Sequence, residues 1–270
     1  MNSFGKNVFG FMFCAALSSS NLAAQPDRFT QGYEAYQASD FRAALELWMP
    51  LAAAGKARAQ YNLGVMYADG RGVSQNTAEA LRWWQMAGRQ GHVRALHNLA
   101  LARIGGIAGN QDFTAARDLL QKAAENGFAN SQYTLGKLYH YGLGVRKDFK
   151  KSAMYFQQAA EQGYTKAAYN LGKAYRDGHG VPVDAVASVR WFKDAAEAGY
   201  VKAQRHLARR LFGGEGTDAD LVGAYKWAVL AERQSVSGSN TLVSKIRGKL
   251  TDAQAKSGEA AADAFLARKR

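Results

Sequence analysis

Residues 57–92 read ARAQYNLGVMYADGRGVSQNTAEALRWWQMAGRQGH, and this stretch contains the pattern that decides the fold. Ala59, Leu63 and Tyr67 fall four positions apart, so they share one face of a predicted helix. The Gly-Arg-Gly sequence at 70–72 should end this helix, because glycine adopts positive φ without strain.

A second helix is expected after this turn, over about 77–90. Asn76 is suited to its N-cap, because a short side-chain oxygen can accept hydrogen bonds from the free amides of the first turn. Trp83 and Ala87 lie on its apolar face, and Gly91 is suited to the left-handed position that ends it. The stretch therefore predicts two helices packed as a hairpin.

The pattern recurs every 36 residues without an insertion. The columns in phase are Gly55, Gly91, Gly127, Gly163 and Gly199; Leu63, Leu99, Leu135, Leu171 and Leu207; Gly70, Gly106, Gly142, Gly178 and Gly214; and Asn76, Asp112, Asp148, Asp184 and Asp220. One hairpin cannot bury both of its faces alone, so the hairpins should stack into an all-α, α/α solenoid. The predicted repeats are 57–92, 93–128, 129–164, 165–200 and 201–236.

The two ends of the repeat block are expected to cap the stack. In residues 25–56, Asp40 and Trp48 occupy the phases of Asn76 and Trp84, which predicts a degenerate helix pair. Residues 237–270 should form capping helices. One is expected around Leu242 to Leu250, and a final alanine-rich helix should follow the capping-box spacing of Thr251 and Gln254.

Residues 1–24 are typical of a secretory signal peptide. Lys6 precedes an apolar run from Val8 to Leu17, and cleavage is expected near Ala24. An uncleaved anchor or a buried core helix is the alternative for this segment. The lone cysteine, Cys14, lies within it, so a disulfide framework is excluded. Cleavage of this leader would make the mature protein periplasmic or secreted. No other stretch is apolar enough to span a bilayer, so the mature chain is expected to have no transmembrane segment.

The chain is strongly basic, with 35 Lys and Arg against 22 Asp and Glu and a formal net charge of +13. Removal of Lys6 with the leader would leave 34 against 22, a net charge of +12. Such an excess indicates an acidic partner. Nucleic acid is disfavoured, because an exported protein rarely meets it.

Residues that could support catalysis or hold a metal are sparse. The chain has no His-Glu-x-x-His motif, and its five histidines lack ligand spacing within any one helix, so we expect no metal site and no cofactor. The histidines are instead expected at the surface or facing a partner. The serine-nucleophile pattern Ser-x-x-Lys occurs only at Ser3 to Lys6, within the leader. The sequence therefore predicts no catalytic residues.

Three segments carry a resemblance to a known family: YNLGVMY at 61–67, GRGV at 70–73 and ALRWW at 80–84. They resemble the Sel1-like repeat, a relative of the tetratricopeptide repeat, in its exported bacterial form. The resemblance implies a right-handed superhelix that acts as a protein-interaction scaffold and whose first helices line a concave groove. Repeats two and five depart from the pattern, since Ala100 and Ala208 replace a glycine.

Candidate partner-binding residues lie on the first helix of each repeat, opposite its buried side. The series is basic and aromatic: Arg58, Tyr61, Arg94, His97, Tyr133, Lys137, Lys166, Tyr169, Lys173, Lys202, Arg205 and Arg209. By the resemblance, it would form the floor of the concave groove. Two alternatives remain open: the tyrosines serve only packing, or the charges form an ordinary solvated helix face. A solvated face would normally mix charge signs, and this series does not.

The expected function is that of a non-catalytic interaction scaffold of the bacterial cell envelope, binding an acidic protein segment or helix. A protein that binds envelope polysaccharide or peptidoglycan is the alternative. An envelope hydrolase of the β-lactamase-like kind is less favoured, because the sequence lacks its nucleophile motif.

Overall fold

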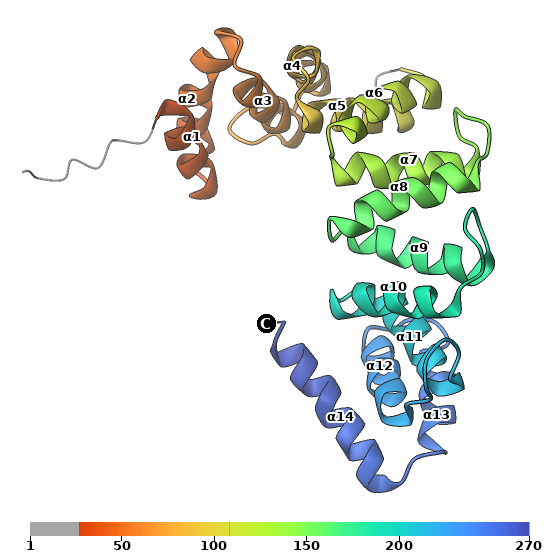
Figure 1. Cartoon of the computed structure of the whole chain (residues 1–270). Coiled ribbons are helices and arrows are strands. Elements are labelled where there is room, and N and C mark those ends of the chain that lie inside the picture. The colour runs from red at the N-terminus through yellow and green to blue at the C-terminus, as the bar shows by residue number, and fades with distance from the viewer. Residues whose placement is uncertain (1–26, 108, 270) are drawn as a thin grey trace, which may run out of the picture.

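The computed structural model describes residues 27–107 and 109–269, and over them the chain is helical with short turns. The helices stack side by side in chain order along an arc (Figure 1). This arrangement confirms the predicted all-α solenoid; the predicted leader 1–24 lies outside the described residues. The helices are α1 (Arg28–Gln37), α2 (Phe41–Ala53), α3 (Ala57–Asp69), α4 (Thr77–Arg89), α5 (Val93–Ile104), α6 (Phe113–Glu125), α7 (Ala129–Tyr141), α8 (Phe149–Glu161), α9 (Thr165–Asp177), α10 (Ala185–Glu197), α11 (Val201–Gly213), α12 (Leu221–Arg233), α13 (Ser239–Arg247) and α14 (Asp252–Ala267).

The second helix of each repeat begins at the predicted cap. The side chain of Asn76 accepts a hydrogen bond from the amide of Glu79 at 3.1 Å. Four aspartates in the same column accept the equivalent bond at 2.8 to 2.9 Å: Asp112, Asp148, Asp184 and Asp220. Each cap satisfies an amide that the helix itself cannot pair, so it sets where the helix starts.

The glycine turns link the two helices of each repeat and contact the preceding repeat. In four repeats the first glycine ends the first helix in the left-handed conformation. The second glycine also has positive φ, as at Gly180, where φ is +79°. A Cβ there would overlap the carbonyl oxygen of Phe149 in the preceding repeat. This turn therefore packs directly on the start of α8, which only glycine permits.

Small and large side chains together fill the stack. Ala59, Ala80 and Ala87 are fully buried, so α3 and α4 approach closely. Leu63 and its column partners are also buried.

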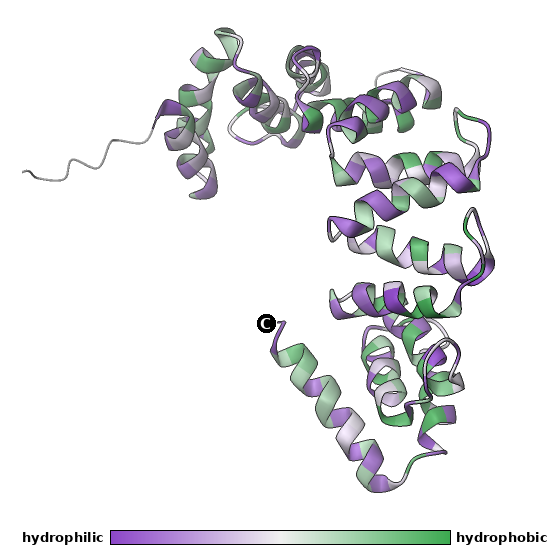
Figure 2. Cartoon of the chain, in the orientation of Figure 1, coloured by the Kyte–Doolittle hydropathy of each residue, from purple (hydrophilic) through white to green (hydrophobic). Residues whose placement is uncertain are grey.

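Hydrophilic and hydrophobic residues alternate along the helices (Figure 2). In the described part of the chain, no helix combines the length and the apolarity needed to cross a bilayer.

Both ends of the stack are covered by helices outside the repeats. At the start, Trp48 is 2% exposed, and its indole nitrogen donates to the carbonyl of Phe29 at 3.1 Å. At the end, α13 begins and finishes three residues earlier than predicted, because it starts directly after the left-handed Gly238. The predicted capping box between Thr251 and Gln254 is confirmed at the start of α14.

Candidate partner-binding surface

The predicted residues lie on the first helices of the five repeats, α3, α5, α7, α9 and α11. We define the first-helix surface as the members that the structure leaves exposed or half-buried. The exposed members are Arg58, Arg94, Lys137, Lys166, Lys202 and Arg209, and the half-buried members are Tyr61, Tyr133, Tyr169, Lys173 and Arg205.

The three tyrosines pack against the residue that precedes the next first helix. The ring of Tyr133 lies 4.9 Å from that of Tyr164, and the ring of Tyr169 lies 5.0 Å from that of Tyr200. Tyr61 stacks on His92 at 4.7 Å. The same contact thus recurs at three repeat junctions. Burial raises the pKa of each of the three tyrosine hydroxyls, so they stay protonated at neutral pH.

Lysines lie over two of these rings. The ammonium of Lys137 is 6.0 Å from the ring centre of Tyr133, and that of Lys173 is 5.9 Å from the ring centre of Tyr169. Each lysine follows its tyrosine by one helical turn, which brings cation and ring together on one face. Packing between repeats therefore accounts for only part of the role of Tyr133 and Tyr169, because a lysine ammonium also lies over each of these two rings.

The cations of this surface lack acidic partners. Among the described residues, no ion pair involves Lys137, Lys166, Lys202 or Arg209. Elsewhere in the described chain some exposed basic residues pair with carboxylates, as Arg82 does with Glu79 at 3.0 Å, whereas Arg89 and Lys150 form no ion pair. The cations of the first-helix surface differ in that they recur on the same helix face of successive repeats. In the described chain, these four cations on α7, α9 and α11 are therefore not neutralised by an ion pair.

His97 is a correction to the sequence analysis. Its side chain was expected to face a partner, but the structure leaves it only 8% exposed. Its Nδ1 lies 3.0 Å from the hydroxyl oxygen of Ser131, and its ring contacts Phe128 edge-on at 5.3 Å. Burial lowers the pKa of His97 to about 4, so it is neutral at physiological pH. It belongs to the packing between repeats two and three.

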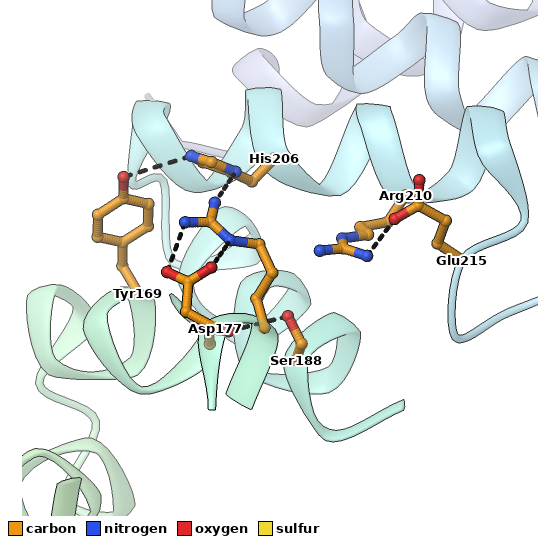
Figure 3. A network of polar contacts seen from close by, with 8 residues as sticks. Tyr169, Asp177, Ser188, His206, Arg210 and Glu215 are labelled. Atoms are coloured by element: carbon orange, nitrogen blue, oxygen red, sulfur yellow. Dashed lines mark hydrogen bonds and ion pairs between the residues drawn. The ribbon is translucent and has the colours of Figure 1, made fainter. Parts of the chain in front are cut away.

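His206 is the second histidine that the structure draws inward, and sequence reasoning did not identify its partners. Figure 3 shows it between Tyr169 and the residues at the end of α9. Its Nε2 lies 3.4 Å from the hydroxyl of Tyr169, and its Nδ1 lies 3.4 Å from a guanidinium nitrogen of Arg176. Arg176 in turn holds Asp177 through two hydrogen bonds of 2.7 Å.

The chemistry of this network assigns the histidine tautomer. A guanidinium only donates, so Nδ1 of His206 accepts and Nε2 carries the hydrogen that it donates to Tyr169. Burial, followed by the nearby positive charges of Arg176 and Arg205, lowers the pKa of His206 to about 4. The network therefore fixes α9 against α11 and leaves Lys173 and Arg209 beside it.

Reactive groups are not gathered in the same way. Within residues 27–107 and 109–269, no three His, Cys, Asp or Glu side chains are grouped so that they could hold a metal ion. The most strongly perturbed histidines, His97 and His206, are engaged in packing and hydrogen bonds between repeats. The arrangement is suited to binding through charge and flat aromatic contact.

Solved structures similar to this chain include the two that follow. A Sel1 repeat protein from Oxalobacter formigenes gives a TM-score of 0.74 at 28% identity, covering 81% of this chain and 90% of that one. The antigen c5321, present in uropathogenic Escherichia coli strains, displays an SLR fold and gives a TM-score of 0.59 at 24% identity. That alignment covers 88% of this chain and 60% of the antigen, and it bears on the fold alone. Comparison with curated proteins gives no match.

The family comparison agrees with the repeats seen in the structure. The family model described as the Sel1 repeat matches residues 57–92, 93–128, 129–164, 165–200 and 201–236, which together make two thirds of the chain. This match confirms the resemblance to the Sel1-like repeat, while its exported form stays a prediction. Sel1 repeat proteins generally act as scaffolds for protein interaction, and their fold is typically non-catalytic. On this evidence the chain belongs to the Sel1 repeat family.

Proposed function

We propose that this protein is an exported, non-catalytic scaffold of the bacterial cell envelope, which binds an acidic protein segment along the first-helix surface. The observation that carries the proposal is the set of exposed cations on α7, α9 and α11 without an acidic partner in the described chain. Like charges on one face repel one another in the folded protein, so an acidic partner would relieve that repulsion.

The chemistry of the surface favours an acidic peptide over other anions. Lys137 and Lys173 each lie over a tyrosine ring, so a bound chain would meet a cation and a flat aromatic surface at successive repeats. Lysine and arginine supply charge-assisted hydrogen bonds to carboxylates, and tyrosine supplies contact area at low entropic cost. Carboxylates spaced along one extended chain or helix would complement this pattern.

The test is a charge reversal on the exposed members of the surface. Lys137, Lys166, Lys202 and Arg209 are replaced together by glutamate, and binding of a fluorescent peptide of alternating Glu and Ala is followed by anisotropy. We expect affinity to fall about tenfold or more, because each replacement removes an attraction and adds a repulsion. The dependence of affinity on salt should fall as well.

A matched control separates the surface from net charge. Arg89, Lys122, Lys150 and Lys256 are all exposed and lie on α4, α6, α8 and α14. Their replacement by glutamate changes the net charge by the same amount and should leave most of the affinity. Equal losses in the two variants would contradict the proposal. Binding to purified peptidoglycan that survives the first-helix reversal would instead favour the polysaccharide alternative.

Export is the second part of the proposal, and it rests on the leader. N-terminal sequencing of the protein recovered from its native cells should show a chain that begins close after Ala24. A chain that begins at Met1 and stays in the cytoplasmic fraction would contradict it.

A further inference from the structure

A small enclosed pocket lies where the third and fourth repeats meet. Its volume is about 80 Å³. The residues that line it are His140 of α7, Ser152 and Phe156 of α8, Asn170, Lys173, Ala174 and Asp177 of α9, and His179 of the following turn. The pocket therefore opens beside Lys173, a member of the first-helix surface.

Ser152 gives the pocket an unsatisfied donor. This residue is 2% exposed, and its hydroxyl has no hydrogen-bond partner. The equivalent residue one repeat later is Ser188, whose hydroxyl donates to the carbonyl of Gly172 at 2.8 Å. A buried hydroxyl without a partner is destabilising, so a ligand that brings an acceptor to Ser152 would relieve that cost.

The junction that holds the pocket differs in sequence from its neighbours. His140 occupies the position that Arg176 holds in the following repeat. There the longer arginine side chain extends to His206, as its 3.4 Å contact shows. The junction between repeats two and three carries apolar residues instead, Ile104 and Ala116, at the positions of His140 and Ser152. Among the repeat junctions, this one combines a shorter side chain with a buried hydroxyl.

Charge and shape define what the pocket can accept. Lys173 supplies one positive charge, and burial, with Lys173 nearby, lowers the pKa of His140, which keeps that ring neutral at pH 7. Asp177 also lines the pocket, but both of its oxygens are held by Arg176 at 2.7 Å. Phe156 and Ala174 provide an apolar wall. One cation, one hydroxyl donor and an apolar wall suit a singly charged group on an aliphatic stem better than a dianion.

We propose that this pocket binds a carboxylate on an aliphatic stem, the side chain of a Glu or Asp in the acidic segment, through the Ser152 hydroxyl and the Lys173 ammonium. The inference rests on the proposed function for the source of the carboxylate. Phe156 and Ala174 would contact the methylene groups of the stem, while the two donors hold the oxygens.

The first experiment uses acetate alone, so that it does not depend on any peptide. Sodium acetate is titrated into the labelled full-length mature protein, and the side-chain amide resonance of Asn170 is followed by NMR at constant ionic strength. We expect a saturable shift, with an apparent Kd at least about tenfold weaker in Ser152→Ala and in Lys173→Met, since hydrogen bonds to charged groups are the strong ones. Sodium phosphate should bind more weakly than acetate.

Two variants serve as matched controls. Ser188→Ala removes a hydroxyl that is already bonded within the protein, and Lys150→Met removes an exposed lysine of α8 that lies outside the pocket and the first-helix surface. Neither should change the apparent Kd for acetate. Ser152→Ala should fold normally, because alanine occupies this column at Ala80, Ala116 and Ala224. No saturable shift, tighter binding of phosphate, or the same Kd in Ser152→Ala as in the wild type would each overturn the proposal.

The peptide of alternating Glu and Ala distinguishes the two proposals. Ser152→Ala should weaken its binding severalfold, although this substitution leaves the net charge unchanged. If the surface charge reversal weakens peptide binding and Ser152→Ala does not, the pocket proposal fails while the proposed function stands. If acetate binding depends on Ser152 and the peptide ignores the surface charge reversal, the pocket holds carboxylates but the proposed function fails.

Discussion

At the junction of repeats two and three, two residues differ from those at the equivalent positions of the other repeats, and their side chains contact each other. His97 stands in a column that otherwise holds tyrosine or arginine, and Ser131 stands in a column of alanines. The structure joins these two exceptions through the 3.0 Å contact between Nδ1 and the serine oxygen. A neutral histidine can be buried there because the hydroxyl satisfies its ring nitrogen.

This buried pair predicts a pH-dependent stability. The pKa of His97 is about 4 in the folded protein and 6.5 as the ordinary value. Between these values the unfolded chain binds a proton that the folded chain rejects, so stability falls as pH drops from about 6.5 toward 4. The expected contribution is about 2 kcal/mol of lost unfolding free energy at pH 5.

The measurement is urea unfolding of wild type and His97→Gln at pH 7.5 and at pH 5. The loss between the two pH values should be smaller by about 2 kcal/mol in the variant, because glutamine cannot titrate. An identical pH-dependent loss in His97→Gln and wild type would show that the histidine is not held neutral.

The sequence predicted the roles of single residues better than it predicted which residues contact each other. The Asn and Asp caps were correct because capping depends on neighbours in the chain. Contacts between residues about 30 positions apart were not predicted. A sequence pattern for one set of them exists, because glutamine occurs at two equivalent positions in every second repeat. Glutamine pairs join the two helices of repeats one, three and five: Gln60 with Gln90 at 2.8 Å, Gln132 with Gln162 at 2.7 Å, and Gln204 with Gln234 at 3.4 Å.

Within each hairpin, the separation of the two helices depends on a glycine and the side chain that it faces. A Cβ on Gly136 would lie 2.6 Å from the ring of Phe156, so this glycine lets the aromatic ring approach the backbone of α7. In repeat two the corresponding residues are Ala100 and Leu120. The departure noted in the sequence is therefore a paired change that conserves the packing volume between two helices.

This pairing predicts a rescue between two substitutions. Gly136→Ala alone should lower the unfolding free energy by about 1–3 kcal/mol through overpacking, despite alanine's better helix propensity. Phe156→Leu alone should also destabilise, because it leaves a cavity. The double variant copies repeat two and should lose less than the sum, with a coupling of about 1 kcal/mol or more in a double-mutant cycle. Strict additivity would contradict the pairing.

Helix positions could be predicted well where caps and glycines mark both ends, and less well where they do not. The repeats offer an Asn or Asp cap and a turn glycine at fixed phase, so their helices fall where expected. Around α13 the apolar pattern alone predicted residues 242–250, whereas Gly238 starts the helix at Ser239. Periodicity locates a helix, and local backbone chemistry decides its first and last residues.

Across the whole molecule, packing runs almost entirely between helices that are adjacent in the chain, and α12 also contacts α14. A stack of this kind distributes its stability along its length, and its last repeat depends on a cap. The candidate surface follows the same logic. The position of each residue within the repeat predicted that its cations lie on the first helix of every hairpin. Burial of His97 and the Arg176 network depend on contacts between repeats, and the position within a repeat does not predict these.

The cap provides a test of how local this stability is. Helix α14 buries Ala255, Gly258 and Ala262, and its Phe265 meets Trp227 of α12 edge-on at 5.2 Å. Ala262 is fully buried, so Ala262→Asp would place a carboxylate in an apolar interface at a cost of several kcal/mol. We expect α14 to detach in this variant.

Hydrogen exchange followed by mass spectrometry separates a local from a global effect. In Ala262→Asp, protection should fall in α14 and α12, while α3 to α8 keep theirs, because the main contacts pass only between neighbours. Ala264→Asp, at an exposed position of the same helix, should leave every segment protected. A uniform loss of protection along the chain would show that the stack unfolds as one unit, since an opening confined to one end cannot reach α3 through nearest-neighbour contacts alone.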